Sequence, residues 1–285
     1  PKYWLWSSIC NTSYFNQVVE LIDRGREGFN QGLFHGFPRI YNYVPGVQKG
    51  NIYLVGGVTG SGKSALATEM FVYNPYEDYL QHLNNTKLKI FIWSLEISPE
   101  ILLTKIICRK IFDDYGLLVD INYVISRGEN RVNQEIYDIV MRYLKYFEDF
   151  EDRVIINGPD NPTGIRNTLL TYLKNHGKLT YKTITIKHKD GSKEDIQIID
   201  KYIPDHDNTY IIAIVDHINI LKSEKGYNKK QTIDKLVEYF VELSNRYKIT
   251  PVMVQQLNRA TEQWERLKVS AIEPQISDFK ESGDT

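Results

Sequence analysis

The sequence predicts an α/β protein in which helices flank a mostly parallel central sheet, with a β-hairpin inserted into the chain. Two observations support this class. Short, solidly apolar segments such as YIIAIV (210–215) alternate along the chain with longer segments of helical periodicity. A glycine-rich turn, VGGVTGSGKS, joins the first apolar segment to a helical one. Strands that are apolar on both faces and separated by helices form buried parallel sheets.

The individual elements follow from hydrophobic periodicity and from turn residues, taken in chain order. A first helix is predicted over 13–29, where apolar residues recur at roughly helical spacing, and a loop rich in glycine and proline follows it. The predicted strands of the sheet are 51–56, 88–94, 153–156, 210–215 and 251–254. The predicted helices between them are 63–72, 99–112, 133–147, 163–175 and 229–247, and the turn PDNPT is expected to cap the fourth of these.

The segment 180–203 departs from this alternation of strands and helices. Apolar and polar residues alternate there on both sides of Asp190-Gly191, which is the pattern of a β-hairpin. We therefore predict an N-terminal helix and entry loop over residues 1–50 and one α/β domain over 51–285, with the hairpin inserted at 180–203.

Composition places the chain among ordinary globular proteins, with 285 residues, 42% hydrophobic and 25% charged. The net charge of −1 gives no sign of nucleic-acid binding through bulk charge, so any such contact must come from local patches. No apolar run is long enough to span a membrane and no signal peptide is recognisable, so we expect a soluble cytoplasmic protein. Cys10 and Cys108 are expected to be reduced thiols, and both ends of the chain are expected to be cut.

A phosphate-binding loop is predicted at the turn between the first strand and the next helix. Residues 57–64, GVTGSGKS, match the pattern G-x-x-x-x-G-K-[ST] in the required context of strand, loop and helix. Glycines let successive N–H groups face phosphate oxygens, the helix N-terminus adds a positive dipole end, and the lysine reaches the outer phosphates. The alternative is a glycine-rich turn that only connects two elements. The residues expected to bind the nucleotide are Gly57, Thr59, Gly60, Ser61, Gly62, Lys63, Ser64 and Ala65.

Two acidic residues at strand ends are candidates for magnesium binding and for catalysis. Asp216 ends the apolar segment YIIAIVD, and together with the Ser64 hydroxyl it is predicted to ligate the Mg²⁺ of a nucleoside triphosphate. Glu96 follows strand 88–94, which would bring it to the same sheet edge as the phosphates, so it is the candidate to activate water. The alternatives are a helix cap or surface residue for Asp216 and a first-turn acid that favours the next helix for Glu96.

These residues and the segments around them resemble the RecA-like C-terminal ATPase domain of the DnaB family of replicative helicases, phage members included. The resemblance rests on GNIYLVGGVTGSGKSALA, FIWSLEIS, IIAIVDHINIL, TPVMVQQLNRATEQ and PQISDFKESGDT, in the family's order and near its spacing. It implies a RecA-like P-loop NTPase fold over 51–285, which uses ATP and Mg²⁺. Lys63, Glu96 and Gln256 are then the catalytic residues. Gln256 is similar to the glutamine that senses the γ-phosphate, its alternative being an exposed strand end.

The resemblance also implies partners. Members of the family form a homo-oligomeric, hexameric ring around single-stranded DNA, and a primase or a helicase loader is a further partner. DNA-facing loops would follow Asp216 and Gln256, and the basic residues there would grip phosphates without reading sequence, unless they are merely solvated. The candidates for DNA binding are Lys222, Arg259, Arg266 and Lys268. The basic finger that the family inserts into a neighbouring ATP site is expected beyond ESGDT, and helix 13–29 resembles at most the linker helix that docks on an adjacent subunit.

The chain departs from the family pattern in three places. It has His217 where the family has tyrosine, it lacks the usual proline in the phosphate loop, and the hairpin has no recognised counterpart. Three hypotheses follow: an ATP-driven helicase or translocase on single-stranded DNA, a recombinase or regulatory ATPase similar to RecA or KaiC, and a structural member that binds nucleotide without unwinding DNA.

Overall fold

Five parallel strands form the central sheet of the computed structural model, which describes residues 14–28, 30–82, 86–187 and 193–257. The strands of this sheet are β1 (Tyr53–Gly57), β2 (Lys87–Ser94), β3 (Val154–Asn157), β6 (Thr209–Asp216) and β7 (Thr250–Gln256). Their spatial order is β1-β7-β6-β2-β3, and every neighbouring pair is parallel. The predicted α/β class with a parallel sheet is confirmed.

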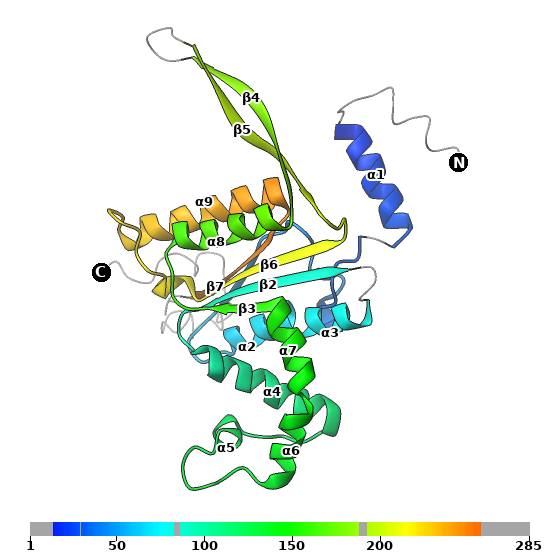
Figure 1. Ribbon diagram of the computed structural model, residues 1–285, viewed down its shortest axis with the longest axis vertical. Coiled ribbons are helices and arrows are strands. Elements are labelled where there is room, and N and C mark those ends of the chain that lie inside the picture. The colour runs from blue at the N-terminus through cyan, green and yellow to red at the C-terminus, as the bar shows by residue number, and fades with distance from the viewer. Residues whose placement is uncertain (1–13, 29, 83–85, 188–192, 258–285) are drawn as a thin grey trace, which may run out of the picture.

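Helices cover both faces of this sheet (Figure 1). One face carries α8 (Pro162–Asn175) and α9 (Lys229–Tyr247). The other is covered by α2 (Lys63–Thr68), the π-helical turn η3 (Glu69–Tyr73), α3 (Asn74–Gln81), α4 (Pro99–Tyr115) and α7 (Leu144–Arg153). Two further helices, α5 (Ile121–Val124) and α6 (Gln134–Arg142), pack on α4 farther from the sheet.

The alternation of side chains along β2 explains why the sheet needs cover on both sides. Ile90 and Ile92 enter the core on the α2 and α4 side, whereas Phe91 and Trp93 enter the core on the α8 and α9 side. Successive residues of a strand point to opposite faces, so a strand with no polar position buries both of its faces. All four side chains are at most 4% exposed.

Two helical segments differ from the sequence prediction. The helix expected to end at Val72 continues to Gln81, because Pro75 occupies the first turn of α3, where its missing N–H costs no helical hydrogen bond. The helix expected over 133–147 is two helices, α6 and α7, which meet at Tyr143. The short α5 was not predicted.

A long antiparallel hairpin of β4 (Gly177–Lys187) and β5 (Lys193–Pro204) extends away from the sheet, as predicted for this segment (Figure 1). Its base is fastened to the domain, because the Tyr202 hydroxyl donates to the carbonyl of His176 at 2.8 Å. Only glycine fits at position 177, since an added Cβ would lie 2.5 Å from the carbonyl oxygen of Ile203 and clash with it.

The predicted N-terminal helix is present as α1 (Tyr14–Arg26), which ends three residues before the predicted end at residue 29. Its apolar side chains are uncovered: Phe15 is 72% exposed, Leu21 55% and Ile22 56%. Contiguous exposed apolar residues of this kind mark interaction surfaces. Among the described residues, no helix has both the length and the apolar character needed to cross a membrane.

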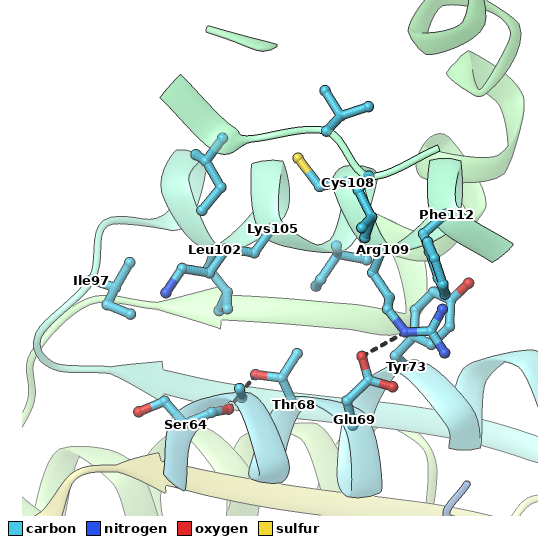
Figure 2. Close-up of a pocket in the computed structure, with 15 residues that line it drawn as sticks. Ser64, Thr68, Glu69, Tyr73, Ile97, Leu102, Lys105, Cys108, Arg109 and Phe112 are labelled. Carbon is cyan, nitrogen blue, oxygen red and sulfur yellow. Dashed lines mark hydrogen bonds and ion pairs between the residues drawn. The ribbon is translucent and has the colours of Figure 1, made fainter. Parts of the chain in front are cut away.

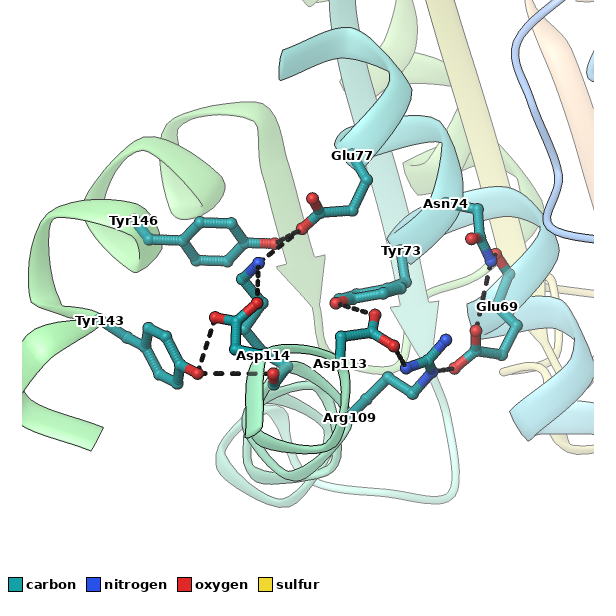
Figure 3. Close-up of polar contacts among 10 residues, drawn as sticks. Glu69, Tyr73, Asn74, Glu77, Arg109, Asp113, Asp114, Tyr143 and Tyr146 are labelled. Atoms are coloured by element: carbon teal, nitrogen blue, oxygen red, sulfur yellow. Dashed lines mark hydrogen bonds and ion pairs between the residues drawn. The ribbon is translucent and has the colours of Figure 1, made fainter. Parts of the chain in front are cut away.

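A chain of charged and phenolic groups fastens α4 to the helices before it (Figure 3). Arg109 donates to Glu69 at 2.9 Å and contacts Asp113, which accepts a 2.7 Å hydrogen bond from the Tyr73 hydroxyl. Burial, then the Asp113 hydrogen bond, raises the pKa of Tyr73, so the hydroxyl keeps its proton and donates. A second set of such bonds ties α4 and α3 to the segment 143–146 through Tyr143 with Asp114 and Tyr146 with Glu77.

We expect Tyr73→Phe to lower the free energy of unfolding by about 1.5–3 kcal/mol, because it removes a hydrogen bond to a charged group inside the fold. Urea unfolding measures the loss. Tyr137→Phe is the matched control, since Tyr137 is half-exposed on α6, and its effect should stay within about 0.5 kcal/mol. Equal stability of the two variants would show that the network contributes little.

Candidate active site

The glycine-rich loop predicted to bind phosphate, called the phosphate loop below, connects β1 to α2 and has the conformation that its glycines were predicted to allow. Gly60 and Gly62 have φ values of 77° and 85°, in the left-handed region that favours glycine. The Ser61 N–H donates to the Val58 carbonyl at 3.2 Å, which closes the turn, and the Leu66 N–H donates to the Gly62 carbonyl at 2.8 Å. The first N–H groups of a helix lack partners within it, so those of α2 are available to an anion at this turn.

Lys63 lies inside the loop. Its Nζ donates to the carbonyl oxygen of Val58 at 3.0 Å. An added Cβ at Gly57 would lie 3.0 Å from Lys63 Cγ, so the first glycine of the motif leaves room for the lysine side chain. The ammonium is therefore held against the loop's own backbone.

Asp216 and Ser64 meet at the end of β6. Burial raises the pKa of the Asp216 carboxyl, and the nearby Ser64 hydroxyl opposes part of that rise. Oδ1 of Asp216 is buried without a hydrogen-bond partner among the described residues. A carboxylate with an unused oxygen beside a hydroxyl is a donor set that suits Mg²⁺.

No group of three or more His, Cys, Asp or Glu residues within the described part of the chain could hold a metal ion. Ser64 and Asp216 remain the described residues that the sequence predicts as Mg²⁺ ligands. Magnesium usually takes one or two carboxylates and completes its shell with substrate phosphates and water. The two residues fit that pattern.

Glu96 lies next to Asp216 across the sheet, as its place after β2 predicts. Ser94 pairs with Asp216 in the β2–β6 register, and the Leu95 N–H donates to the Asp216 carbonyl at 2.8 Å. The Glu96 side chain is 65% exposed, and its Oε2 lies 3.8 Å from Nε2 of His217. His217 was not among the predicted site residues. Its departure from the family's tyrosine was the signal that could have identified it.

Gln256 contacts the phosphate loop directly. It pairs with Gly57 in the β1–β7 register, and its Nε2 donates to Oγ1 of Thr59 at 2.5 Å. The next residue, Leu257, donates its N–H to the Gly57 carbonyl at 3.0 Å. A strand-end amide is thus joined to a loop 197 residues earlier in the chain.

An apolar cavity of about 620 Å³ adjoins Ser64 on the α4 side of α2 (Figure 2). Leu102, Ile106 and Phe112 on α4 line it opposite Thr68. Figure 2 shows Thr68 turned back toward Ser64, whose carbonyl it contacts at 2.8 Å. The walls suit aliphatic or aromatic surface rather than phosphate.

The predicted nucleotide and catalytic residues are therefore brought to one edge of the sheet: the 57–65 loop, Glu96, Asp216 and Gln256 all follow or end parallel strands there. Lys222 is exposed on the loop after β6, where its N–H donates to the Asp160 carbonyl at 3.3 Å. Arg259, Arg266 and Lys268, the other candidates for DNA binding, lie outside the described residues.

Comparisons with known proteins identify a family and a fold for the chain. The family model described as the DnaB-like helicase C terminal domain matches residues 133–285. A solved structure of a DnaB-like replicative helicase, described with its interactions with primase, aligns with a TM-score of 0.61 and 14% sequence identity. The alignment covers 96% of this chain and 54% of that one, so the chain spans about half of its length. At this identity the likeness shows the fold, and a search of curated proteins finds no match.

Proposed function

Because the chain belongs to the DnaB-like helicase C-terminal domain family, we propose that it is an ATP-hydrolysing motor that moves along single-stranded DNA and unwinds duplex DNA during replication. The observation that carries the proposal is the convergence of the phosphate loop with Glu96, Asp216 and Gln256 at one sheet edge. These residues could bind the phosphates, hold Mg²⁺, activate the attacking water and sense the γ-phosphate, which are the functions that transfer of a phosphoryl group to water requires.

Binding of the triphosphate begins at the loop 57–65. The N–H groups of the loop and of the first turn of α2 take the phosphate oxygens, and Lys63 exchanges the Val58 carbonyl for the γ-phosphate. Ser64 and Asp216 would hold Mg²⁺, which would supply positive charge to neutralise the triphosphate.

Hydrolysis uses the carboxylate of Glu96. Its exposed position at the sheet edge lets it accept a proton from the attacking water, and the neighbouring Leu95 N–H contact keeps its backbone beside Asp216. Gln256 contacts Thr59 of the phosphate loop. Loss of the γ-phosphate would therefore change the conformation at the end of β7 and in the residues that follow it. This is the proposed link between the nucleotide and DNA.

Assembly into a hexameric ring is proposed from the family and is supported by the uncovered apolar face of α1. In such a ring the site would be completed by a neighbouring subunit. We propose Lys222, Arg259, Arg266 and Lys268 as contacts to DNA phosphates, and a cytoplasmic location. A primase or a helicase loader is the proposed further partner, because the structurally similar helicase is described with its interactions with primase.

We expect ATP turnover in the presence of Mg²⁺ to rise several-fold when single-stranded DNA is added, because the DNA-facing loops adjoin the catalytic strand ends. A phosphate-release assay measures this, with duplex DNA as the control, and mass measurement in ATP should give a hexamer. Negligible turnover under all conditions would favour a structural nucleotide-binding protein. Filaments without unwinding would favour a recombinase-like or regulatory ATPase.

A further inference from the structure

His217 occupies a position that the proposed reaction has not used. Its side chain is only 11% exposed, and its Nε2 lies 3.8 Å from Oε2 of Glu96. It directly follows Asp216 in the chain. We propose that His217 is a positioning residue, which holds the Glu96 carboxylate toward the nucleotide.

The backbone makes this contact a fixed feature of the fold. Ser94 and Asp216 are paired in the β2–β6 register, and the Leu95 N–H donates to the Asp216 carbonyl at 2.8 Å. The chain around Glu96 is therefore held against the chain around His217. Burial restricts the motion of the His217 ring, so the ring can hold the exposed side chain of Glu96 in one position.

The Glu96 side chain needs a contact that limits its conformations. Its side chain is 65% exposed, and an exposed glutamate samples many rotamers, which costs up to about 2 kcal/mol to order. Catalytic groups act efficiently only when they are held close to the productive geometry. A neighbouring hydrogen-bond donor that favours one rotamer of Glu96 lowers the entropic cost of ordering this side chain during the reaction.

The proposed role places the proton on Nε2, the ring nitrogen that faces Glu96. Nδ1 of His217 is buried and has no hydrogen-bond partner among the described residues, whereas Nε2 faces Glu96. The 3.8 Å separation is longer than a hydrogen bond. Hydrogen bonds at catalytic sites often tighten only when the substrate is bound, so the proposal has this contact close to hydrogen-bond length in the nucleotide-bound state.

This inference rests on the proposed ATPase function, and two matched variants test it. His217→Met fills a similar volume without a donor, whereas His217→Gln keeps an N–H donor. We expect His217→Met to lower kcat about tenfold, which corresponds to about 1.4 kcal/mol, with the Kd for a fluorescent ATP analogue unchanged within about twofold. His217→Gln should restore at least half of the wild-type kcat.

A double-mutant cycle separates positioning from a general structural role. In a Glu96→Gln background, His217→Met should cause no further loss of turnover, because there is no base left to position. A tenfold loss in both backgrounds, or equal losses in the Met and Gln variants, would overturn the inference. Thermal melting checks folding, and His217→Leu replaces the methionine variant if that one does not fold.

The same series distinguishes the two levels of the proposal. A wild-type chain that does not hydrolyse ATP, with or without DNA, refutes the proposed function and the inference with it. Wild-type turnover that falls in Glu96→Gln but is unchanged in His217→Met refutes only the role of His217.

Discussion

Glu96→Gln is expected to retain ATP binding while turnover falls by about 10² or more, the contribution of a lost general base. Glutamine has nearly the same size and shape as glutamate but cannot accept the proton of the attacking water. The side chain is 65% exposed at the sheet edge and does not belong to either hydrophobic core, so folding should be unaffected. Steady-state phosphate release and binding of a fluorescent ATP analogue, measured on the same sample, check both parts.

The control for this variant is Glu100→Gln. Glu100 is an acid in the first turn of α4, four residues after Glu96, and it tests the alternative that Glu96 only favours that helix. The control should keep turnover within about twofold of wild type. If Glu96→Gln has normal turnover and differs only in melting temperature, the catalytic assignment is wrong.

Lys63→Ala is expected to weaken ATP binding about ten- to a hundredfold. Hydrogen bonds to charged groups contribute about 1.5–3 kcal/mol, and each 1.4 kcal/mol changes an affinity tenfold. The Lys63 ammonium is already held at the loop through its hydrogen bond to the Val58 carbonyl, so the substitution removes a preplaced positive charge. Titration of the same ATP analogue measures the change.

A lysine at the opposite end of the sheet is the matched control. Lys87 begins β2, whereas the phosphate loop follows the end of β1, and parallel strands put these positions at opposite edges. Lys87→Ala should leave the Kd unchanged within about twofold. Wild-type affinity in Lys63→Ala would show that the glycine-rich turn only connects β1 to α2.

Strong local signals explain which elements were predicted closely. Helix α9 spans Lys229–Tyr247, the predicted bounds, and begins with a capping box in which Asn228 and Gln231 bond each other's backbone N–H groups. The five sheet strands were found because each contains a run of apolar residues. Prediction was weaker where helices meet, since the break at Tyr143 and the π-helical turn before α3 depend on packing against α4 rather than on local sequence.

The sequence by itself determined the residues that end or follow the strands: the phosphate loop, Glu96, Asp216 and Gln256. Only the tertiary structure decided which of them touch, because contacts such as that of Gln256 with Thr59 depend on the strand order β1-β7-β6-β2-β3. The same order places the buried ring of His217 beside Glu96, 121 residues earlier in the chain. The local sequence predicts the chemistry of a residue and the helix or strand in which it lies. The pairing of strands decides which residues are neighbours across a sheet.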